Sequence, residues 1–352
     1  MAKSKDIYLS VLETLKGDIL NGKYPFQSKL PSQEDLADEL EVSRSTLRKV
    51  LAELEKDGFI ESRKGSGSFV CNKNINRYIP FIVPKNDTTH RLAEILEGAN
   101  SYFNKIGFSS LLIIKSDGHS QSERDVVSKL FDDGHRNFII FPTSSVRSSL
   151  FYRKLQQQGC NFVFIDTLPE KIACDYVTSS NFLGGYEATK KLIELGHTDI
   201  AFCSIPKPKH ANTINERYLG YLSALEENNI EPSKNSCFIC ENMSYEDFGN
   251  YIADNTTSTA IFASTDQLGI ILVNKFAKLD KRPAIIGFDN IILAESFDLA
   301  TINQNLYRIG QASAELLHKR IVNPSKEYEH LYVPISLVER ASLNDGALSD
   351  KE

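Results

Sequence analysis

Apolar positions follow two different patterns along the chain, and the change between them divides it. Up to about residue 71, apolar residues recur at helical spacing and then in two short β-prone runs at 59–62 and 68–71. Beyond residue 78, apolar runs of strand length alternate with longer amphipathic stretches. The segment 72–77 is polar and without a strong pattern, which is typical of a linker. The pattern therefore predicts a first domain over 1–71, a linker over 72–77, a larger region over 78–344 and a tail over 345–352.

Three helices are predicted in the first domain. An apolar residue at every fourth position predicts the first over about residues 5–21. Ser32 and Ser43 each stand directly before a helical stretch, where a hydroxyl oxygen accepts a hydrogen bond from a free backbone N–H, so both are expected to be N-caps. The helix after Ser43 is expected to bury one apolar stripe, Leu47, Val50, Leu51 and Leu54. Its other face and its first turn are left with hydroxyl and cationic side chains.

Those polar side chains are the predicted DNA-binding surface. Donors and positive charge in the N-terminal half of a helix are what a recognition helix needs to read base edges. A basic, glycine-rich turn over 63–67 lets backbone N–H groups approach phosphates closely. The predicted contacts are Ser32, Gln33, Ser43, Arg44, Ser45, Thr46, Arg48, Lys49, Lys64, Gly65, Ser66 and Gly67. We therefore expect 30–70 to be a winged helix-turn-helix that binds double-stranded DNA; the alternative is an ordinary polar helical hairpin followed by a β-turn.

The region 78–344 is predicted to be an α/β domain. Strand-like runs fall at 79–83, 109–114, 137–141, 161–165, 176–178, 199–204, 237–240, 259–263 and 284–288. Helical patterns fall at 88–106, 121–133, 146–158, 183–195, 212–228, 265–279 and 306–320. This alternation predicts parallel sheets covered by helices, and the length of the region favours two lobes. Lobe one is expected at about 78–178 and 305–325, and lobe two at about 179–304 and 326–344.

Polar residues stand where several of these strands end. Ligands in such folds bind at the carboxyl ends of strands or between two lobes. The candidates are Lys85, Asn86, Asp166, Asn181, Asp266 and Asp289, with Arg217 at the start of a helix. Carboxylates accept hydrogen bonds from hydroxyl groups, and arginine donates two parallel hydrogen bonds, so this set suits the adjacent hydroxyls of a sugar. Phe182 or Phe288 would then cover the apolar face of the sugar ring. The structural alternatives are a surface ion pair for Arg217, helix caps for Asp266 and Asp289, and turn residues for Lys85 and Asn86.

The charge of the chain is unevenly distributed. The formal net charge is −6, yet residues 1–77 carry 13 Lys and Arg against 12 Asp and Glu, while the rest carries 27 against 34. A local basic patch is what binds phosphates, so an acidic chain remains compatible with DNA binding.

Other features of the sequence exclude several classes of function. The six cysteines are scattered without zinc-ligand spacing and are expected to be reduced core residues. No apolar run is long enough to span a bilayer, and no signal peptide is visible, so the protein is expected to be cytoplasmic and to need no membrane. Without a catalytic motif, a metal-ligand set or a cofactor-binding loop, we expect no enzyme activity, no metal and no cofactor.

Two family resemblances add to this interpretation. Residues 7–71 resemble the DNA-binding domain of the GntR family, through Leu30-Pro31-Ser32, Val42-Ser43-Arg44, Thr46-Leu47-Arg48, Asp57-Gly58 and Gly65-Ser66-Gly67-Ser68-Phe69-Val70, with Glu34 where many members have a basic residue. About 78–341 resembles the LacI/GalR effector domain, which is similar in fold to periplasmic sugar-binding proteins of type I. That resemblance rests on 180–185, 192–197, 216–221, 262–266, 286–290 and 301–304, and is interrupted at Pro80. It implies sugar contacts from Arg217, Asp266 and Asp289, and from Asn181 and Gln304.

The combined plan resembles the arabinose repressors and some fucose regulators. It implies a homodimeric repressor of carbohydrate-utilisation genes, released from operator DNA by a monosaccharide such as L-arabinose or L-fucose. The alternatives are an activator, a regulator that answers a nucleoside or another small polyol, and an enzyme fused to a DNA-binding head. An enzyme of the pyridoxal-phosphate type would need a Schiff-base lysine and a phosphate site.

Overall fold

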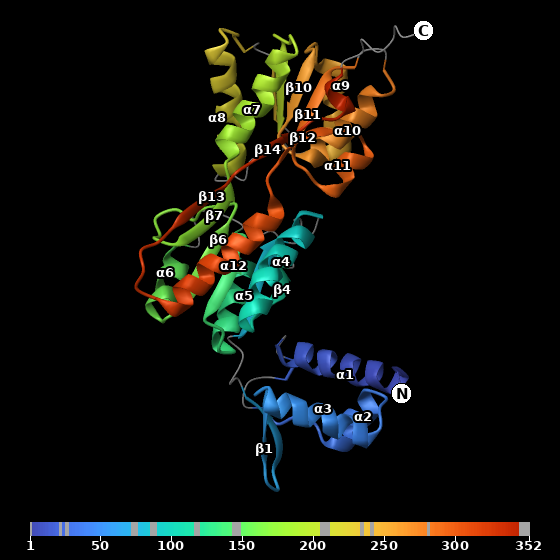
Figure 1. Ribbon diagram of the computed structural model, residues 1–352, viewed down its shortest axis with the longest axis vertical. Coiled ribbons are helices and arrows are strands. Elements are labelled where there is room, and N and C mark those ends of the chain that lie inside the picture. Colours follow the sequence, from blue (N-terminus) through green and yellow to red (C-terminus); the bar gives the residue numbers. More distant parts are fainter. Residues whose placement is uncertain are drawn as a thin grey trace.

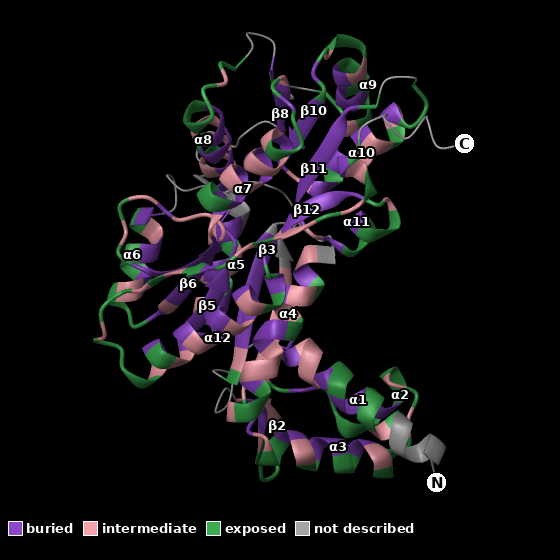
Figure 2. Cartoon of the chain, turned by 45° about the horizontal axis from the view of Figure 1, so that its top comes forward, coloured by how far each residue is buried: buried purple, intermediate pink, exposed green. Residues whose placement is uncertain are grey.

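The structure is a computed structural model that describes residues 2–20, 23–24, 28–71, 77–84, 90–115, 120–142, 149–204, 212–232, 236–239, 243–279 and 282–344. These residues form a small head and a larger body of two stacked lobes (Figure 1). Each lobe has its own six-stranded sheet, and Figure 2 shows that strands in the middle of both sheets are buried. This arrangement confirms the predicted fold class, a winged helix-turn-helix joined to a two-lobed α/β body.

The head contains three helices and one hairpin: α1 (Ala2–Leu20), α2 (Gln33–Glu39), α3 (Arg44–Lys56), β1 (Ile60–Arg63) and β2 (Gly67–Val70). The Ser32 hydroxyl accepts a hydrogen bond from the Asp35 N–H at 3.1 Å, and the Ser43 hydroxyl accepts one from the Thr46 N–H at 3.2 Å. Both predicted N-caps are thereby confirmed. The head core lies between α1 and α3 and includes Leu15, Leu47, Val50 and Leu54, all of them fully buried.

Lobe one is a parallel sheet covered by helices. Its strands are β3 (Tyr78–Pro84), β4 (Ser109–Lys115), β5 (Asn137–Ile140), β6 (Asn161–Ile165), β7 (Asp175–Ser179) and β13 (His330–Val333), in the order β13-β7-β6-β5-β3-β4. Its helices are α4 (His90–Phe103), α5 (Ser120–Asp132), α6 (Ser149–Gln157) and α12 (Leu306–Val322), with a 3₁₀ turn η3 (Asn104–Ile106) after α4. All strand pairs of this sheet are parallel, as the alternating pattern predicts.

Lobe two repeats this plan. Its strands are β8 (Ile200–Ser204), β9 (Cys237–Ile239), β10 (Ala260–Ala263), β11 (Ala284–Asp289), β12 (Ala300–Asn303) and β14 (Ser336–Val338), in the order β14-β12-β11-β10-β8-β9. Its helices are α7 (Asn181–Glu194), α8 (Asn212–Glu227), α9 (Tyr245–Asn255), α10 (Asp266–Phe276) and α11 (Ile292–Ser296), with a 3₁₀ turn η4 (Ala341–Leu343). Only β14 runs antiparallel to its neighbour, β12.

The last strands correct the predicted lobe boundary. Residues 326–344 were expected in lobe two, whereas β13 pairs in parallel with β7 at the edge of the sheet of lobe one. The chain then enters lobe two between β13 and β14. The sequence did not predict β12, β13 or β14, because a run of only three or four residues carries too little of the strand pattern to stand out before neighbouring strands pair with it.

The head rests directly on lobe one. Tyr78 at the start of β3 and Leu111 in β4 pack against the head core, and the rings of Phe59 and Tyr78 lie 5.2 Å apart between centroids. Of the predicted linker 72–77, only Arg77 is among the described residues. The first strand of lobe one is therefore joined to the head by side-chain packing as well as by the chain.

Candidate functional site

The predicted DNA-binding side chains lie on the surface of the head. On the two capped helices, Gln33, Arg44, Ser45, Arg48 and Lys49 are exposed, whereas Thr46 is half-buried. At the tip of the hairpin, residues 64–67 are all exposed. Ser32 and Ser43 are exposed too, but their hydroxyls hold the ends of α2 and α3. The predicted surface is thus accessible to a duplex.

Two side chains of α2 contact the arginines of α3. Arg44 pairs with Glu34, and Arg48 Nε donates a hydrogen bond to Gln33 Oε1 at 3.3 Å. The side chains of Arg44 and Glu34 are 62% and 64% exposed, so water screens their attraction and the pair is weak. Glu34 therefore partly neutralises Arg44 in the free head, and a phosphate has to compete with it.

The hairpin brings one cation to the DNA-binding face that the sequence did not suggest. Lys29 forms a β-bridge with Phe69, and its side chain lies beside Gly67. Arg63 is engaged within the hairpin, where it pairs with Glu61 and lies over the Phe69 ring at 4.3 Å. Lys29 was missed because its position beside the hairpin depends on backbone pairing with β2, which no local pattern reveals.

Four charged residues line up where the two lobes meet, and we call them the cross-lobe cluster: Asp166, Arg91, Asp289 and Arg217. Arg91 Nη2 lies 3.8 Å from Asp166 Oδ1, and Arg91 Nη1 lies 3.9 Å from Asp289 Oδ1. Arg217 Nη1 lies 3.7 Å from the same Asp289 oxygen. Asp166 and Arg91 belong to lobe one, and Asp289 and Arg217 to lobe two. Negative and positive groups therefore alternate across the junction, with no net formal charge.

Arg217 is held in place by several contacts within lobe two. Its Nε donates to Asn181 Oδ1 at 2.8 Å, and its Nη1 donates to the Ser264 carbonyl at 2.7 Å. The guanidinium carbon lies 3.7 Å from the centroid of the buried Phe288 ring. A Cβ at Gly185 would overlap the backbone of Arg217, so only glycine lets α7 and α8 approach this closely. Burial lowers the pKa of Arg217, although Asp289 offsets part of this effect.

Asp289 is the carboxylate on which the cluster converges. It ends β11 and is buried, with 4% of its surface exposed. Gln304 donates from Nε2 to Asp289 Oδ1, and its own Oε1 accepts from the Ser179 hydroxyl at 2.6 Å. Burial raises the pKa of Asp289, while Arg91 and Arg217 act in the opposite direction. The predicted residues Asn181, Arg217, Asp289 and Gln304 are therefore brought together in one network.

Asp266 interacts electrostatically with Asp289, but its hydrogen bonds go to other partners. Its Oδ2 accepts from the Ile291 N–H at 2.8 Å, and the Thr301 hydroxyl donates to its Oδ1. The side chain is fully buried, and burial, with a further contribution from Asp289, raises its pKa to about 7. These two hydrogen bonds tie Asp266 to the loop that follows β11 and to β12, and its role in ligand binding stays a prediction. Both carboxylates follow a buried strand, so the sequence pattern did not distinguish them.

Other predicted positions differ in accessibility. Asp166 follows β6 with a positive φ of 67°, and its side chain is 21% exposed. Phe182 is 46% exposed, while Phe288 is buried under Arg217. Lys85 and Asn86 lie outside the described residues. Arg91, for which the sequence pattern gave no signal, joins the cluster from the first turn of α4 because the fold brings that turn to the lobe junction.

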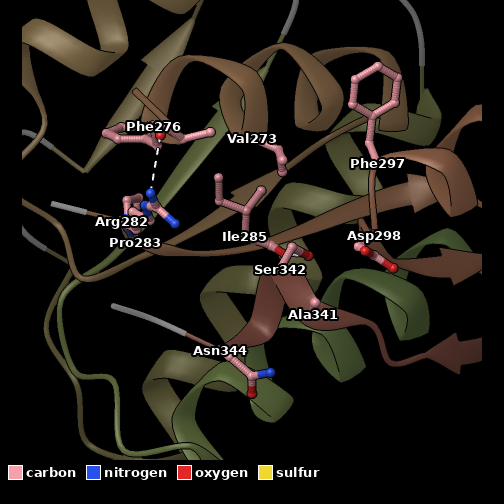
Figure 3. Close-up of a pocket in the computed structure, with 11 residues that line it drawn as sticks. Val273, Phe276, Arg282, Pro283, Ile285, Phe297, Asp298, Ala341, Ser342 and Asn344 are labelled. Carbon is pink, nitrogen blue, oxygen red and sulfur yellow. Dashed lines mark hydrogen bonds between the residues drawn. The ribbon is translucent and has the colours of Figure 1, made fainter. Parts of the chain in front are cut away.

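A separate pocket lies in lobe two (Figure 3). Its volume is about 240 Å³, and Val273, Phe276, Ile285 and Phe297 supply apolar walls with Arg282 and Asp298 at its edge. None of the predicted ligand-binding residues lines it. Arg282 is already engaged there, donating to the Ala277 carbonyl at 3.2 Å.

The described residues also bear on the chemistry of cysteines, metals and membranes. None of the described cysteines forms a disulfide. Cys160, Cys174 and Cys203 are buried as predicted, but Cys237 is exposed at the lobe edge, which corrects its assignment to the core. Among the described residues, no group of His, Cys, Asp or Glu has the arrangement of a metal site. No described helix combines the length and the apolar character needed to cross a membrane.

A winged head joined to a two-lobed α/β body defines a class, the ligand-responsive regulators of transcription. Known families match both parts. Residues 7–70 match "Bacterial regulatory proteins, gntR family", residues 76–247 match "Periplasmic binding proteins and sugar binding domain of LacI family", and residues 189–343 match "Periplasmic binding protein-like domain". The chain belongs to the LacI-type bacterial transcriptional repressors and carries a GntR-type DNA-binding head.

Curated relatives cover most of the chain. It is 30% identical over 303 residues to the HTH-type transcriptional repressor PurR of Vibrio campbellii, covering 82% of this chain and 86% of the relative. It is 23% identical over 359 residues to the arabinose metabolism transcriptional repressor of Geobacillus stearothermophilus, covering 95% of this chain and 97% of that protein. The second similarity is lower in identity but extends over nearly the whole of both chains.

Solved structures share the fold of the body. A LacI family transcriptional regulator from Enterococcus faecium, solved with bound ribose, is 26% identical and has a TM-score of 0.64, covering 75% of this chain and 98% of that one. The transcriptional regulator CelR in complex with cellobiose is 21% identical and has a TM-score of 0.66, covering 89% of this chain and all of that one. At that identity, the similarity to CelR shows the fold alone.

Proposed function

We propose that the chain represses transcription by holding operator DNA with its winged head and that a neutral monosaccharide, bound between the lobes, releases it. The observation that carries this proposal is the cross-lobe cluster. Its groups alternate in sign, and its three ion pairs, at 3.7 to 3.9 Å, are longer than hydrogen bonds. The cluster is therefore polar and partly desolvated, and its charged groups face one another at distances longer than a hydrogen bond.

Hydroxyl groups of a ligand can form hydrogen bonds with both the carboxylates and the guanidinium groups of such a cluster. A hydroxyl donates to a carboxylate and accepts from a guanidinium at the same time, so it can bridge an ion pair of this length. An anionic ligand would meet Asp166 and Asp289, and a cationic ligand would meet Arg91 and Arg217. Adjacent hydroxyls without formal charge avoid both repulsions. This reasoning favours a neutral sugar over a sugar phosphate.

The effector class that we propose is a pentose or a deoxyhexose, with L-arabinose and L-fucose as the first candidates. The relative that matches nearly the whole chain is named an arabinose metabolism repressor, and the ribose in the Enterococcus faecium structure is a pentose. Those ligands and names belong to those proteins, and their bearing on this chain is support for the proposal. A nucleoside remains the alternative polyol.

We further propose that two copies act together on DNA. Each head would place α3 in the major groove of one half-site and the tip of its hairpin against the backbone or minor groove. A homodimer would then recognise a near-palindromic operator. Sedimentation or light scattering of the free protein and of the DNA complex should give two chains per operator; one chain per operator would contradict this part of the proposal.

The effector can act only if it binds one arrangement of the lobes better than the other. A sugar that bridges Asp166 and Arg91 of lobe one to Asp289 and Arg217 of lobe two favours the closed arrangement. The packing of Tyr78 and Leu111 against the head core offers a direct route from lobe one to the head. A change in lobe angle would thereby alter the spacing of the two heads.

A thermal-shift screen tests the effector. The purified chain is heated with pentoses, deoxyhexoses, hexoses, their phosphates and nucleosides, each in excess. A ligand at about 100 times its Kd adds roughly 2.7 kcal/mol to the stability of the domain that binds it. We expect a neutral sugar to raise the melting temperature and to lower operator affinity in a fluorescence-anisotropy titration.

Matched variants make the screen specific. Asp289→Asn should lose the response, whereas Arg308→Ala should keep it, because Arg308 contacts Gln311 and Glu315 on its own helix and pairs with no member of the cluster. A response only to phosphates or nucleosides would reject the neutral sugar. A response that survives in Asp289→Asn would place the ligand elsewhere, with the pocket of Figure 3 as the next site to test.

A further inference from the structure

The pocket of Figure 3 is separate from the cross-lobe cluster. Pro283, just before β11, and Ile285, near the start of β11, line the pocket, whereas Asp289 of the cluster ends the same strand. The other walls come from the C-terminal end of α10, the end of α11 and the turn η4. A molecule in this pocket would therefore contact lobe two alone.

Hydrogen bonds hold the walls of the pocket together. The Ser342 hydroxyl donates to the Ile285 carbonyl at 2.6 Å and accepts from the Ala300 N–H at 2.7 Å. The Ser342 N–H donates to the Asp298 carbonyl at 3.0 Å. These bonds tie η4 to β11 and β12, so the pocket is formed before a ligand enters. Its volume of about 240 Å³ is slightly below the roughly 300–1,000 Å³ typical for drug-sized ligands, so it suits a smaller molecule.

The pocket combines apolar walls with one charged side chain of each sign. Most of the side chains that form the walls are hydrocarbon, namely Val273, Phe276, Pro283, Ile285 and Phe297. Arg282 and Asp298 are the charged residues of the lining, and both are exposed. Figure 3 shows them on opposite sides of Ile285. A ligand that matches this lining has an apolar body and no net charge.

Both charged side chains keep hydrogen-bonding groups for a ligand. Arg282 donates from Nη2 to the Ala277 carbonyl at 3.2 Å, which uses one of its five N–H donors. The Asp298 carboxylate has no hydrogen bond or ion pair with the part of the chain that the structure describes. An ammonium group suits Asp298 and a carboxylate suits Arg282, whereas a ligand with one charge alone would be repelled by one of the two. The hydroxyl groups of a sugar would lose hydrogen bonds to water against the apolar walls.

We propose that this pocket is a second ligand site, which binds an amino acid with an apolar body. The ammonium group of the amino acid donates to Asp298, its carboxylate accepts from Arg282, and its hydrocarbon part packs against Val273 and Phe276. This site is independent of the proposed sugar site, because no member of the cross-lobe cluster lines the pocket.

Calorimetry on the full chain tests the proposal with two amino acids that differ in the separation of their charges, L-leucine and 6-aminohexanoate. Each is compared with analogues that lack one charge: 4-methylpentanoate and 3-methylbutylamine for leucine, and hexanoate and pentylamine for 6-aminohexanoate. We expect at least one of the amino acids to bind. Its two analogues should bind about tenfold or more weakly, because each has lost a hydrogen bond between charged groups.

Variants locate the site. Arg282→Gln and Asp298→Asn should each weaken binding of the amino acid about tenfold or more. Val273→Trp fills the pocket and should abolish binding. Asp254→Asn, which neutralises an exposed carboxylate on α9, is the matched control for Asp298→Asn and should bind as the unaltered chain does. Circular dichroism and the melting temperature establish that each variant is folded.

Three results would overturn the proposal. The first is that neither amino acid binds the unaltered chain, and a change in the sedimentation of Val273→Trp would then assign the pocket to a contact between two copies. The second is that the analogues bind as tightly as the amino acid. The third is that binding survives in Val273→Trp, which would place the ligand elsewhere. None of these results bears on the proposed sugar site, which the response of Asp289→Asn tests separately.

Discussion

The DNA-binding face and the cross-lobe cluster are built in opposite ways. The face takes its side chains from one short stretch, 29–67, and nearly all of them are exposed. The cluster takes single residues from four separate elements or loops, at positions 91, 166, 217 and 289, and Arg217 and Asp289 are buried. One site is presented to a large, charged partner, and the other is partly withdrawn from water.

This difference decides what stabilises the charged side chains of each site. Arg44 and Arg48 remain hydrated, so their contacts with Glu34 and Gln33 cost little to break when a phosphate or base arrives. Arg217 and Asp289 have lost water, and each depends on the other and on fixed dipoles such as the Ser264 carbonyl. Substitutions in the face should therefore affect binding alone, whereas substitutions in the cluster should affect stability and binding together.

The largest effect is expected from Arg217→Ala. It removes the donor to Asn181 and Ser264 and one of the cations beside Asp289. Breaking a buried pair by removing one partner costs about 3–5 kcal/mol. Denaturant unfolding should show a loss of this order in the body, and sugar binding should disappear in calorimetry.

Arg217→Lys provides the matched comparison, since it keeps the charge but not the fork over Phe288. Its stability should lie between those of Arg217→Ala and the unaltered chain. If Arg217→Ala were as stable as the unaltered chain and bound the same sugar, the buried network would have no energetic role.

Arg48→Ala is the corresponding test of the exposed face. If Arg48 reads a guanine edge, operator affinity should fall by about 1–3 kcal/mol. The melting temperature and the affinity for sugar should not change, because the side chain is exposed. Lys64→Ala should instead reduce the dependence of affinity on salt, as expected for a phosphate contact. Equal operator binding by both variants at every salt concentration would refute the proposed docking.

The pH dependence of stability tests the buried carboxylate that supports the cluster. The pKa of Asp266 is about 7 in the folded chain, against an ordinary value of 3.8. Between about pH 4 and 7 the folded chain therefore keeps a proton that the unfolded chain releases, so the stability from this group is lost as pH rises through the window. In Asp266→Asn this contribution is absent, and the decline of the melting temperature with pH should be shallower.

His135 works in the opposite direction over nearly the same range. Burial lowers its pKa from 6.5 to about 4, so its contribution to stability is lost as pH falls through this interval. Because His135 is present in both proteins, the difference between the two melting curves isolates Asp266. Parallel pH profiles for the two proteins would show that Asp266 is ionised throughout.

The smallest effect is expected from Glu34→Gln. It removes a negative charge from the DNA-binding face and frees Arg44, so operator affinity should rise a few-fold at low salt, less at high salt. Stability should hardly change, since exposed pairs contribute little. Glu39→Gln, a neutralisation at the other end of α2, is the control and should leave operator binding nearly unaltered. Weaker binding of Glu34→Gln would mean that Glu34 itself contacts a base.

Much of the structure of the head could be predicted from short-range sequence patterns, and the structure confirms these predictions. The caps at Ser32 and Ser43 and the apolar stripe from Leu47 to Leu54 depend on neighbours within one or two helical turns. In the body, periodicity identified the helices α4 to α8, α10 and α12 and the strands β3 to β11, but it did not predict α9 or α11. It also missed the short strands β12, β13 and β14, whose strand conformation depends on pairing with β11, β7 and β12.

The candidate site was predicted less completely. Arg217, Asn181, Asp289 and Gln304 meet as the resemblance to the LacI/GalR family implied, whereas Asp266 turns its carboxylate into the lobe toward Thr301 and the Ile291 N–H. Asp266 and Asp289 each follow or end a buried strand, so the sequence pattern is the same for both. Only the tertiary structure shows that their side chains have different hydrogen-bond partners. Arg91 gave no signal at all.

The sequence by itself determined the three helices and the hairpin of the head, most helices of the body, its strands β3 to β11, and which polar residues stand at the ends of those strands. These are properties of neighbours along the chain, through capping, periodicity and the sign of charge. The tertiary structure alone decided that Arg91 reaches Asp289 and that β13 belongs to lobe one. Contacts across a lobe junction depend on the relative position of two separately folded sheets, which no pattern within a single element encodes.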